Sequence, residues 1–189
     1  MFIVIEGIDG CGKSTQARLL FEWLMENGHD VLLTAEPTRN RIGIFIREIL
    51  SGSEKADPKT LALLFTADRY EHLENEVSPA LSDGKIVISE RYFHSTIAYQ
   101  SAQGVSREWL NDLNYFVLKP GLTILLDVKP EIAIKRIKRT ETNEIFENRD
   151  FLEKVHKEYL RFDDVKRVDA NPRPEIVFDE IKEIVSELI

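Results

Sequence analysis

The sequence predicts an α/β fold in which a five-stranded parallel sheet is flanked by helices. Short runs rich in Val, Ile and Leu alternate along the chain with longer segments of helical periodicity, and strands separated by helices form parallel sheets. A glycine-rich loop follows the first run, and polar residues follow the second and third runs directly. Because ligands bind beyond the carboxyl ends of the strands in such sheets, these residues are expected to share one site.

The five expected strands are residues 2–6, 30–35, 85–90, 122–128 and 165–170. Each run is short and largely apolar, as the buried strands of a parallel sheet are. Glu36-Pro37 ends the second strand, because the residue before a proline avoids the helical region. Asp83-Gly84 marks the turn into the third strand.

The expected helices lie between the strands, at residues 13–27, 42–50, 58–81, 130–139, 151–162 and 174–189, with further helical stretches as far as Tyr115. Gly28 suits the end of the first helix, and Pro58 suits the first position of the third. Pro79 indicates a bend or a break in that third helix. Residues 140–150 are polar and are expected to be irregular. Because the sequence shows no repeat or linker, a single domain is expected over residues 1–189.

Composition limits the classes of function. The chain is 43% hydrophobic and 31% charged, which is typical of a globular protein. Its apolar runs are too short to cross a bilayer, and its first residues lack a signal-peptide pattern, so no membrane partner is expected. The formal net charge of −8 argues against a nucleic-acid polymer as partner, because such proteins usually carry a basic surplus. Cys11 is the only cysteine, so no internal disulfide can form and a cytoplasmic setting is expected.

The stretch GIDGCGKS at residues 7–14 fits the phosphate-loop pattern G-x-x-x-x-G-K-[ST]. Its glycines let the backbone approach phosphates closely, and its N–H groups form an anion cradle with the helix that follows. Lys13 can reach the outer phosphates of a nucleotide, and the Ser14 hydroxyl can ligate Mg²⁺. The residues expected to bind ATP here are Gly7, Ile8, Asp9, Gly10, Cys11, Gly12, Lys13, Ser14 and Thr15. Motors, switches and kinases all use such a loop, so the loop alone leaves the reaction open.

Two pairs of side chains indicate an acceptor. Arg39 and Arg91 follow the ends of the second and third strands, so both can point into the same crevice, and guanidinium groups suit phosphate oxygens. Phe65 and Arg69 are four residues apart on a predicted helix and therefore share a face. An aromatic ring beside a hydrogen-bond donor suits a pyrimidine base, although Phe65 could equally belong to the core.

Four stretches carry a resemblance to a known family. They are EGIDGCGKSTQ (6–16), EPTR (36–39), LLFTADRYEH (63–72) and ERYFHSTIAYQ (90–100). In this order and spacing they resemble the thymidylate kinases, and the resemblance covers nearly the whole chain. It implies a P-loop nucleoside monophosphate kinase fold with a short lid near residues 136–150. It also implies a homodimer that uses ATP and Mg²⁺ to phosphorylate dTMP to dTDP, a step of dTTP synthesis.

The resemblance also implies an acceptor site. The expected dTMP-binding residues are Asp9, Glu36, Arg39, Phe65, Arg69, Arg91, Ser95, Thr96, Tyr99 and Gln100. Among them Arg39 and Arg91 would bind the phosphate, while Phe65 would stack on thymine and Arg69 would bond its exocyclic oxygen. Tyr99 would lie against the deoxyribose and exclude a 2′-hydroxyl.

Catalysis would rest on positioning and on neutralisation of negative charge. The expected catalytic residues are Lys13, Arg39, Glu90, Arg91 and Arg136, and the expected Mg²⁺ ligands are Ser14 and Glu90. Outside the loop, the residues expected to bind ATP are Arg136, Arg139, Arg149 and Asn171.

Two positions depart from the family pattern. Glu90 stands where many relatives have aspartate, and Gly10 stands where some relatives have an arginine. The lid arginines are therefore expected to supply that positive charge, although Glu141, Glu144 and Glu147 beside them are unexpected near a triphosphate. Asp9, an acid in an anion-binding loop, would contact the 3′-hydroxyl of dTMP or bond its own turn.

Two alternatives remain at this point. The first is a kinase of another nucleoside, deoxynucleoside or nucleotide, which the short region between the second and third strands permits. The second is a P-loop ATPase that acts with a protein partner. A guanine-specific switch is not expected, because the sequence contains no N-K-x-D motif.

Overall fold

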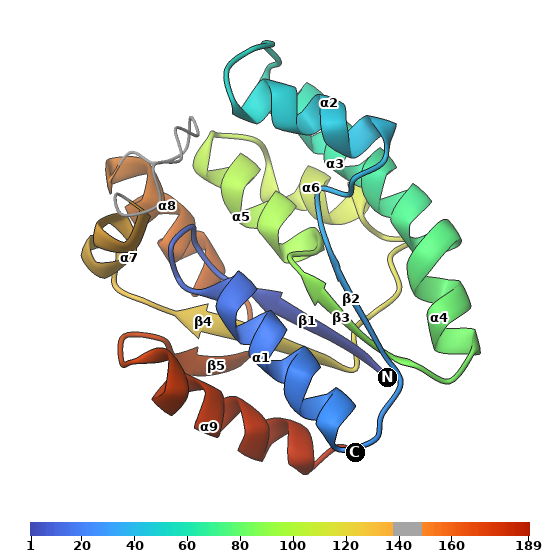
Figure 1. Ribbon diagram of the computed structural model, residues 1–189. Coiled ribbons are helices and arrows are strands. Elements are labelled where there is room, and N and C mark those ends of the chain that lie inside the picture. The colour runs from blue at the N-terminus through green and yellow to red at the C-terminus, as the bar shows by residue number, and fades with distance from the viewer. Residues whose placement is uncertain (138–148) are drawn as a thin grey trace.

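The computed structural model describes residues 1–137 and 149–189 and confirms the five-stranded parallel sheet (Figure 1). The strands are β1 (Phe2–Glu6), β2 (Val31–Ala35), β3 (Ile86–Glu90), β4 (Leu122–Asp127) and β5 (Lys166–Asp169). They lie in the order β2-β3-β1-β4-β5, and every pair is parallel. All of β1 is buried because it has neighbours on both edges and helices on both faces, which explains its unbroken apolar run.

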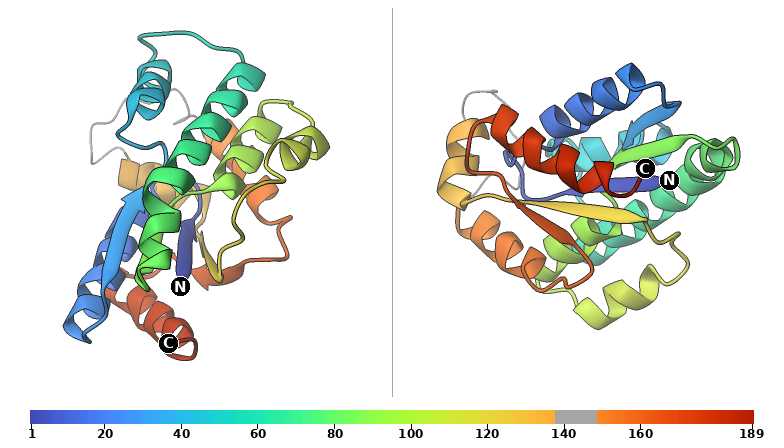
Figure 2. Two further views of the ribbon diagram at one scale, coloured as in Figure 1. Left: turned by 90° about the vertical axis from the view of Figure 1, so that its right-hand side faces the viewer. Right: turned by 90° about the horizontal axis from the view of Figure 1, so that it is seen from below.

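Helices form a layer on each side of the sheet (Figure 2). Helices α1 (Lys13–Glu26) and α9 (Pro174–Ser186) pack together over one face. Helices α5 (Phe93–Ala102) and α8 (Arg149–Tyr159) pack together over the other. The remaining helices are α2 (Arg41–Leu50), α3 (Pro58–His72), α4 (Ser78–Ser82), α6 (Arg107–Leu113) and α7 (Pro130–Ile137). None of the helices in the described ranges is long and apolar enough to cross a membrane.

The expected helix at residues 58–81 is divided into three parts. Helix α3 ends at His72, a π-helical turn η1 (Leu73–Val77) follows, and α4 then continues to Ser82. Pro79 explains why the regular α-helix stops here: it has no N–H, and its ring would collide with the carbonyl four residues earlier. The break predicted near Pro79 is therefore confirmed, but it is a wider helical turn placed just before the proline.

The boundaries around the expected lid differ from the prediction. Residues 149 and 150, expected to be irregular, form the first turn of α8, and this helix ends at Tyr159 instead of residue 162. Helix α7 is described as far as Ile137. The rest of the lid, residues 138–148, lies outside the described residues.

Candidate active site

The phosphate loop adopts the conformation that its glycines predict. Gly7, Gly10 and Gly12 all have positive φ angles, of 143°, 77° and 102°, which residues with a Cβ rarely adopt. Helix α1 begins directly after Gly12. Because glycine has no side chain, no side chain of Gly12 caps the first N–H groups of this helix. The buried Lys13 Nζ donates to the carbonyl oxygens of Gly7 and Ile8, each at 3.0 Å. The loop therefore joins a helix N-terminus to an ammonium group, as an anion site requires.

Helix α7 lies directly against Gly10. A Cβ added at Gly10 would come within 2.4 Å of the Ala133 carbonyl oxygen and 2.9 Å of Ile137 Cγ1. No side chain fits there unless α7 moves. The close approach of this helix therefore accounts for a glycine at position 10, where an arginine would not fit.

A cavity of about 220 Å³ opens beside the loop at the carboxyl ends of β1, β2 and β3. It is lined by Asp9, Glu36, Pro37, Arg47, Leu50, Phe65, Arg69, Glu90, Arg91, Tyr92, Ser95, Thr96, Tyr99 and Gln100. The structure thus gathers every expected acceptor residue except Arg39 around one space. These residues come from segments up to 91 positions apart in the sequence, and the strand ends bring them together.

Arg91 is held in a strained conformation at the edge of this cavity. Its φ of 69° lies in the left-handed region, which costs a residue with a Cβ about 1–2 kcal/mol. The Arg91 N–H donates to the Ile5 carbonyl at 2.9 Å, and the Arg91 carbonyl accepts from Ser89 Oγ at 2.8 Å. Its guanidinium pairs with Asp9 and donates to Ser95 Oγ at 3.1 Å. Strain of this kind is typical of functional positions, where the surroundings fix the backbone.

Asp9 joins the phosphate loop to the cavity. The Tyr99 hydroxyl donates to Asp9 Oδ2 at 2.7 Å and accepts from the Asp9 N–H at 3.0 Å. Burial raises the pKa of the Asp9 carboxyl, but the charges of Arg91 and Lys13 outweigh it and hold that pKa below its usual value. Burial, and then the Asp9 charge, raise the pKa of the Tyr99 phenol well above its usual value, so its hydroxyl stays protonated. Asp9 therefore bonds across to the cavity residues in preference to its own turn.

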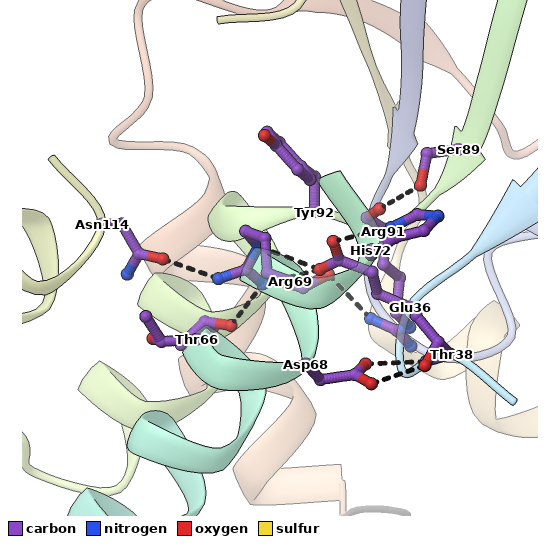
Figure 3. Close-up of polar contacts among 12 residues, drawn as sticks. Glu36, Thr38, Thr66, Asp68, Arg69, His72, Ser89, Arg91, Tyr92 and Asn114 are labelled. Carbon is purple, nitrogen blue, oxygen red and sulfur yellow. Dashed lines mark hydrogen bonds and ion pairs between the residues drawn. The ribbon is translucent and has the colours of Figure 1, made fainter. Parts of the chain in front are cut away.

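A buried polar network supports the opposite end of the cavity (Figure 3). Arg69 is 1% exposed, and its Nε donates to Glu36 Oε2 at 2.9 Å. Its two terminal nitrogens donate to Asn114 Oδ1 at 2.6 Å and to Thr96 Oγ1 at 2.9 Å. Glu36 therefore fixes the orientation of Arg69. Phe65 lines the cavity and also packs against the core. It is therefore both a core residue and a residue that a bound base could contact.

Gln100 presents an unpaired acceptor in the wall of the cavity. The residue is fully buried, and its Nε2 donates to Gln103 Oε1 at 3.3 Å. Its Oε1 has no hydrogen-bond partner within the described part of the chain. A buried oxygen without a partner is costly, and an N–H group on a bound ligand would satisfy it.

Arg47 is a cavity residue that the sequence reasoning missed. It lies on α2 and donates to the carbonyl oxygens of Pro37 and Thr38. From the other side, the buried Asp68 carboxylate accepts from the Thr38 N–H at 2.7 Å and its hydroxyl at 2.6 Å. Arg39, which was expected here, is exposed and is not one of the residues that line the cavity. The sequence of α2 reads as an ordinary amphipathic helix, so it gave no signal that Arg47 reaches this loop.

Ser14 and Glu90 meet beside the phosphate loop. The Ser14 hydroxyl donates to Glu90 Oε1 at 2.9 Å. Hydroxyl and carboxylate oxygens are ligands that Mg²⁺ takes when phosphates and waters complete its shell. Glutamate, although one methylene longer than the aspartate of many relatives, is therefore within reach of the serine, and the pair fits a Mg²⁺ site.

Arg136 ties the phosphate loop to the segment after β5. Its guanidinium donates to the carbonyl oxygens of Ala170, Asn171 and Pro172 at 3.0, 3.2 and 3.3 Å. It also reaches the Cys11 carbonyl at 3.4 Å. The Asn171 side chain accepts from the Lys129 N–H at 3.0 Å, so it fixes this segment against the start of α7.

The other lid residues contribute less to the site as described. Arg149 is exposed and pairs with Glu131 and Glu153. Arg139 and the glutamates at 141, 144 and 147 lie outside the described residues. In the loop, burial raises the pKa of the Cys11 thiol, which indicates a packed and unreactive side chain.

Comparison with known proteins identifies relatives of this chain. The family model described as thymidylate kinase matches residues 5–181. A probable thymidylate kinase of Thermococcus onnurineus is 45% identical over an alignment that covers 98% of this chain and 97% of the relative. A probable thymidylate kinase of Pyrobaculum aerophilum is 44% identical over an alignment that covers 100% of this chain and 97% of the relative. A probable thymidylate kinase of Methanocaldococcus jannaschii is 43% identical over an alignment that covers 100% of this chain and 91% of the relative.

Proposed function

Since this chain belongs to the thymidylate kinase family, we propose that it transfers the γ-phosphoryl group of ATP to dTMP. An oxygen of the dTMP phosphate forms a bond to the γ-phosphorus, and the bond from that phosphorus to the β–γ bridging oxygen breaks. The products are dTDP and ADP. The observation that supports this reaction is the position of the acceptor cavity, which shares Asp9 with the phosphate loop and carries Arg91 at the boundary between them.

The charges of the cavity give dTMP one favoured orientation. Its phosphate lies at Arg91, close to the loop that binds ATP, and Arg47 lines the same cavity. Its deoxyribose lies beside Tyr99 and Asp9. Its base lies against Phe65, where Arg69 can donate to a thymine oxygen and Gln100 Oε1 can accept from the ring N–H. The ring N–H of thymine and one of its two carbonyl oxygens thus meet buried partners of opposite polarity.

Transfer between two nucleotides concentrates negative charge, and the site is built to neutralise it. Lys13 lies under the loop, and Arg91 faces the transferring group. Mg²⁺, held by Ser14 and Glu90, would neutralise the outer phosphates and orient them. The protein itself mainly binds, orients and excludes water, as phosphoryl transfer requires.

A substrate screen tests the proposal. Purified protein is incubated with ATP and Mg²⁺ and with each of dTMP, dUMP, dCMP, AMP, GMP and thymidine. The phosphorylated product is measured, which is a diphosphate from each monophosphate and dTMP from thymidine. We expect the highest kcat/KM with dTMP. Preferred turnover of thymidine or another monophosphate would identify a kinase of a different acceptor. ATP loss that no acceptor stimulates would identify an ATPase.

Tyr99 should control the choice between deoxyribose and ribose. Tyr99→Ala should lower the ratio of kcat/KM for dTMP over ribosyl-TMP about 10-fold or more, because the ring no longer fills the space of a 2′-hydroxyl. Tyr99→Phe is the matched control, because it keeps the ring and removes only the hydroxyl that bonds Asp9. It should change the ratio by less than about 2-fold. Equal ratios in both variants would contradict the steric role.

We also propose that the protein forms a homodimer through α2 and α3, which pack against each other at one end of the molecule (Figure 1). Large apolar side chains are exposed on both helices: Ile44 and Phe45 on α2, and Leu63 and Tyr70 on α3. Exposed apolar surface of this kind marks association sites. Leu63→Glu should shift the molar mass measured by light scattering from dimer to monomer. A wild-type monomer at micromolar concentration would contradict the proposal.

A further inference from the structure

A buried carboxylate, that of Glu6, lies beneath the acceptor site without touching the cavity. Glu6 is the last residue of β1 and is 0% exposed, and it is not one of the described residues that line the cavity. Four donors converge on it. Its Oε1 accepts from the N–H groups of Tyr92 at 2.8 Å and Ser95 at 3.2 Å. Its Oε2 accepts from the hydroxyls of Ser95 at 2.6 Å and Tyr159 at 2.9 Å.

Two of these bonds replace the N-terminal cap of α5. This helix begins at Phe93, and Tyr92, which precedes it, makes no side-chain capping bond. The first N–H groups of a helix have no partner within the helix and are usually satisfied by a nearby side chain. Here a carboxylate from a distant strand takes that place. A negative charge at this end of the helix is also favourable.

The same arrangement fixes Arg91 from both sides. The peptide group before Arg91 is held because its N–H donates to Ile5 O, and the peptide group after it is held because the Tyr92 N–H donates to Glu6. Two successive residues of β1 therefore hold both peptides that flank the residue with φ of 69°. The Arg91 side chain is held as well, because Ser95 Oγ accepts from its Nη1 while donating to Glu6.

We propose that Glu6 is a positioning residue, which orients Arg91 towards the phosphate of the acceptor through the N-terminal turn of α5. This inference rests on the proposed function, since it assigns the phosphate of dTMP to Arg91. It makes a specific claim about affinity: Glu6 supports binding of the phosphate group and leaves binding of the nucleoside unaffected. The base of the nucleoside contacts Phe65, Arg69 and Gln100, and none of these three residues is a hydrogen-bond partner of Glu6.

The test compares dTMP with thymidine, the same ligand without its phosphate, by titration calorimetry on wild type and Glu6→Gln. The glutamine has nearly the same shape, but its amide nitrogen cannot accept from the two hydroxyls. We expect the Kd for dTMP to rise about 10-fold, which is about 1.4 kcal/mol, and the Kd for thymidine to change less than about 2-fold. Equal weakening of both ligands, or no change in either, would overturn the inference.

Two further variants keep the test decisive. Val185→Ala truncates a buried residue at the far end of α9 and controls for a loss of stability alone, so both Kd values should stay unchanged. If Glu6→Gln does not fold, Glu6→Asp carries the same comparison, because it keeps the charge but is too short to reach all four donors. Wild-type protein that binds dTMP no better than thymidine would instead overturn the proposed function.

Discussion

Replacing Arg91 with glycine should lower kcat/KM for dTMP about 10³-fold and leave the protein folded. Removal of one group that stabilises charge in the transition state costs about 10²–10³-fold, and arginines aimed at a transferring phosphoryl group contribute about 10³–10⁵-fold. Arg91 is the guanidinium that lies between the phosphate loop and the acceptor cavity, where it pairs with Asp9. Its loss leaves Lys13, whose Nζ is 3.9 Å from Asp9 Oδ1, as the remaining one of the two cations that lower the pKa of Asp9. The measurement is steady-state kinetics with dTMP and ATP varied separately.

Arg91→Ala is the matched variant that separates charge from backbone strain. Both substitutions remove the guanidinium, so both should lose activity to the same extent. Glycine adopts a φ of 69° freely and alanine does not, so the glycine variant should be more stable by about 1 kcal/mol. For a chain of this size that difference corresponds to about 2–4 °C in Tm. Activity near that of wild type in either variant would remove Arg91 from the mechanism, and equal Tm values would contradict the strained backbone.

The candidate site could be predicted where sequence position alone places a residue in space. Polar residues directly after strands must meet at the carboxyl edge of a parallel sheet, and this brought Glu36 and Arg91 to one cavity with the loop. The spacing of Phe65 and Arg69, which are four residues apart on one helix, predicted that they share a face, and both line the cavity. The fold followed from the same reasoning, because the alternation of apolar strands and helices leaves few arrangements.

The remaining site residues depend on contacts that no local pattern encodes. Arg47 reaches the loop after β2 because α2 turns back over it, and nothing in an amphipathic sequence signals that approach. Glu6 reads as the last residue of a strand, yet its partners lie 86 to 153 residues away. The π-helical turn before Pro79 likewise has no signal of its own in the sequence beyond the proline that follows it.

Gly10 shows how the structure changes the meaning of a residue. In the sequence it marks a missing arginine whose charge other residues have to supply. In the structure it is the point where α7 touches the phosphate loop, with the Ala133 carbonyl only 2.4 Å from where a Cβ would be. Arg136 lies on the same helix and bonds the Cys11 carbonyl, so the position of α7 also determines where this arginine lies. The contact of α7 with the loop therefore leaves no room for a side chain at position 10 and places Arg136 beside the loop.

Gly10→Ala should therefore lower both stability and ATP affinity. The methyl group forces α7 away from the loop, which costs about 1–3 kcal/mol for overpacking, and the φ of 77° adds about 1–2 kcal/mol. At about 2–4 °C per kcal/mol, Tm should fall by at least about 4 °C. The KM for ATP should rise more than the KM for dTMP, because the displaced helix carries Arg136. Thermal unfolding and steady-state kinetics measure the two effects.

Gly84→Ala is the control that isolates the contact with α7. Gly84 has a φ of 81°, close to that of Gly10, but a Cβ added there meets no heavy atom within 4 Å among the described residues. Its substitution should cost only the backbone strain, about 1–2 kcal/mol, and leave both KM values unchanged. The difference between the two variants is then the cost of moving α7. If Gly10→Ala is no less stable than Gly84→Ala and binds ATP normally, α7 does not constrain the loop, and a side chain at position 10 would be tolerated.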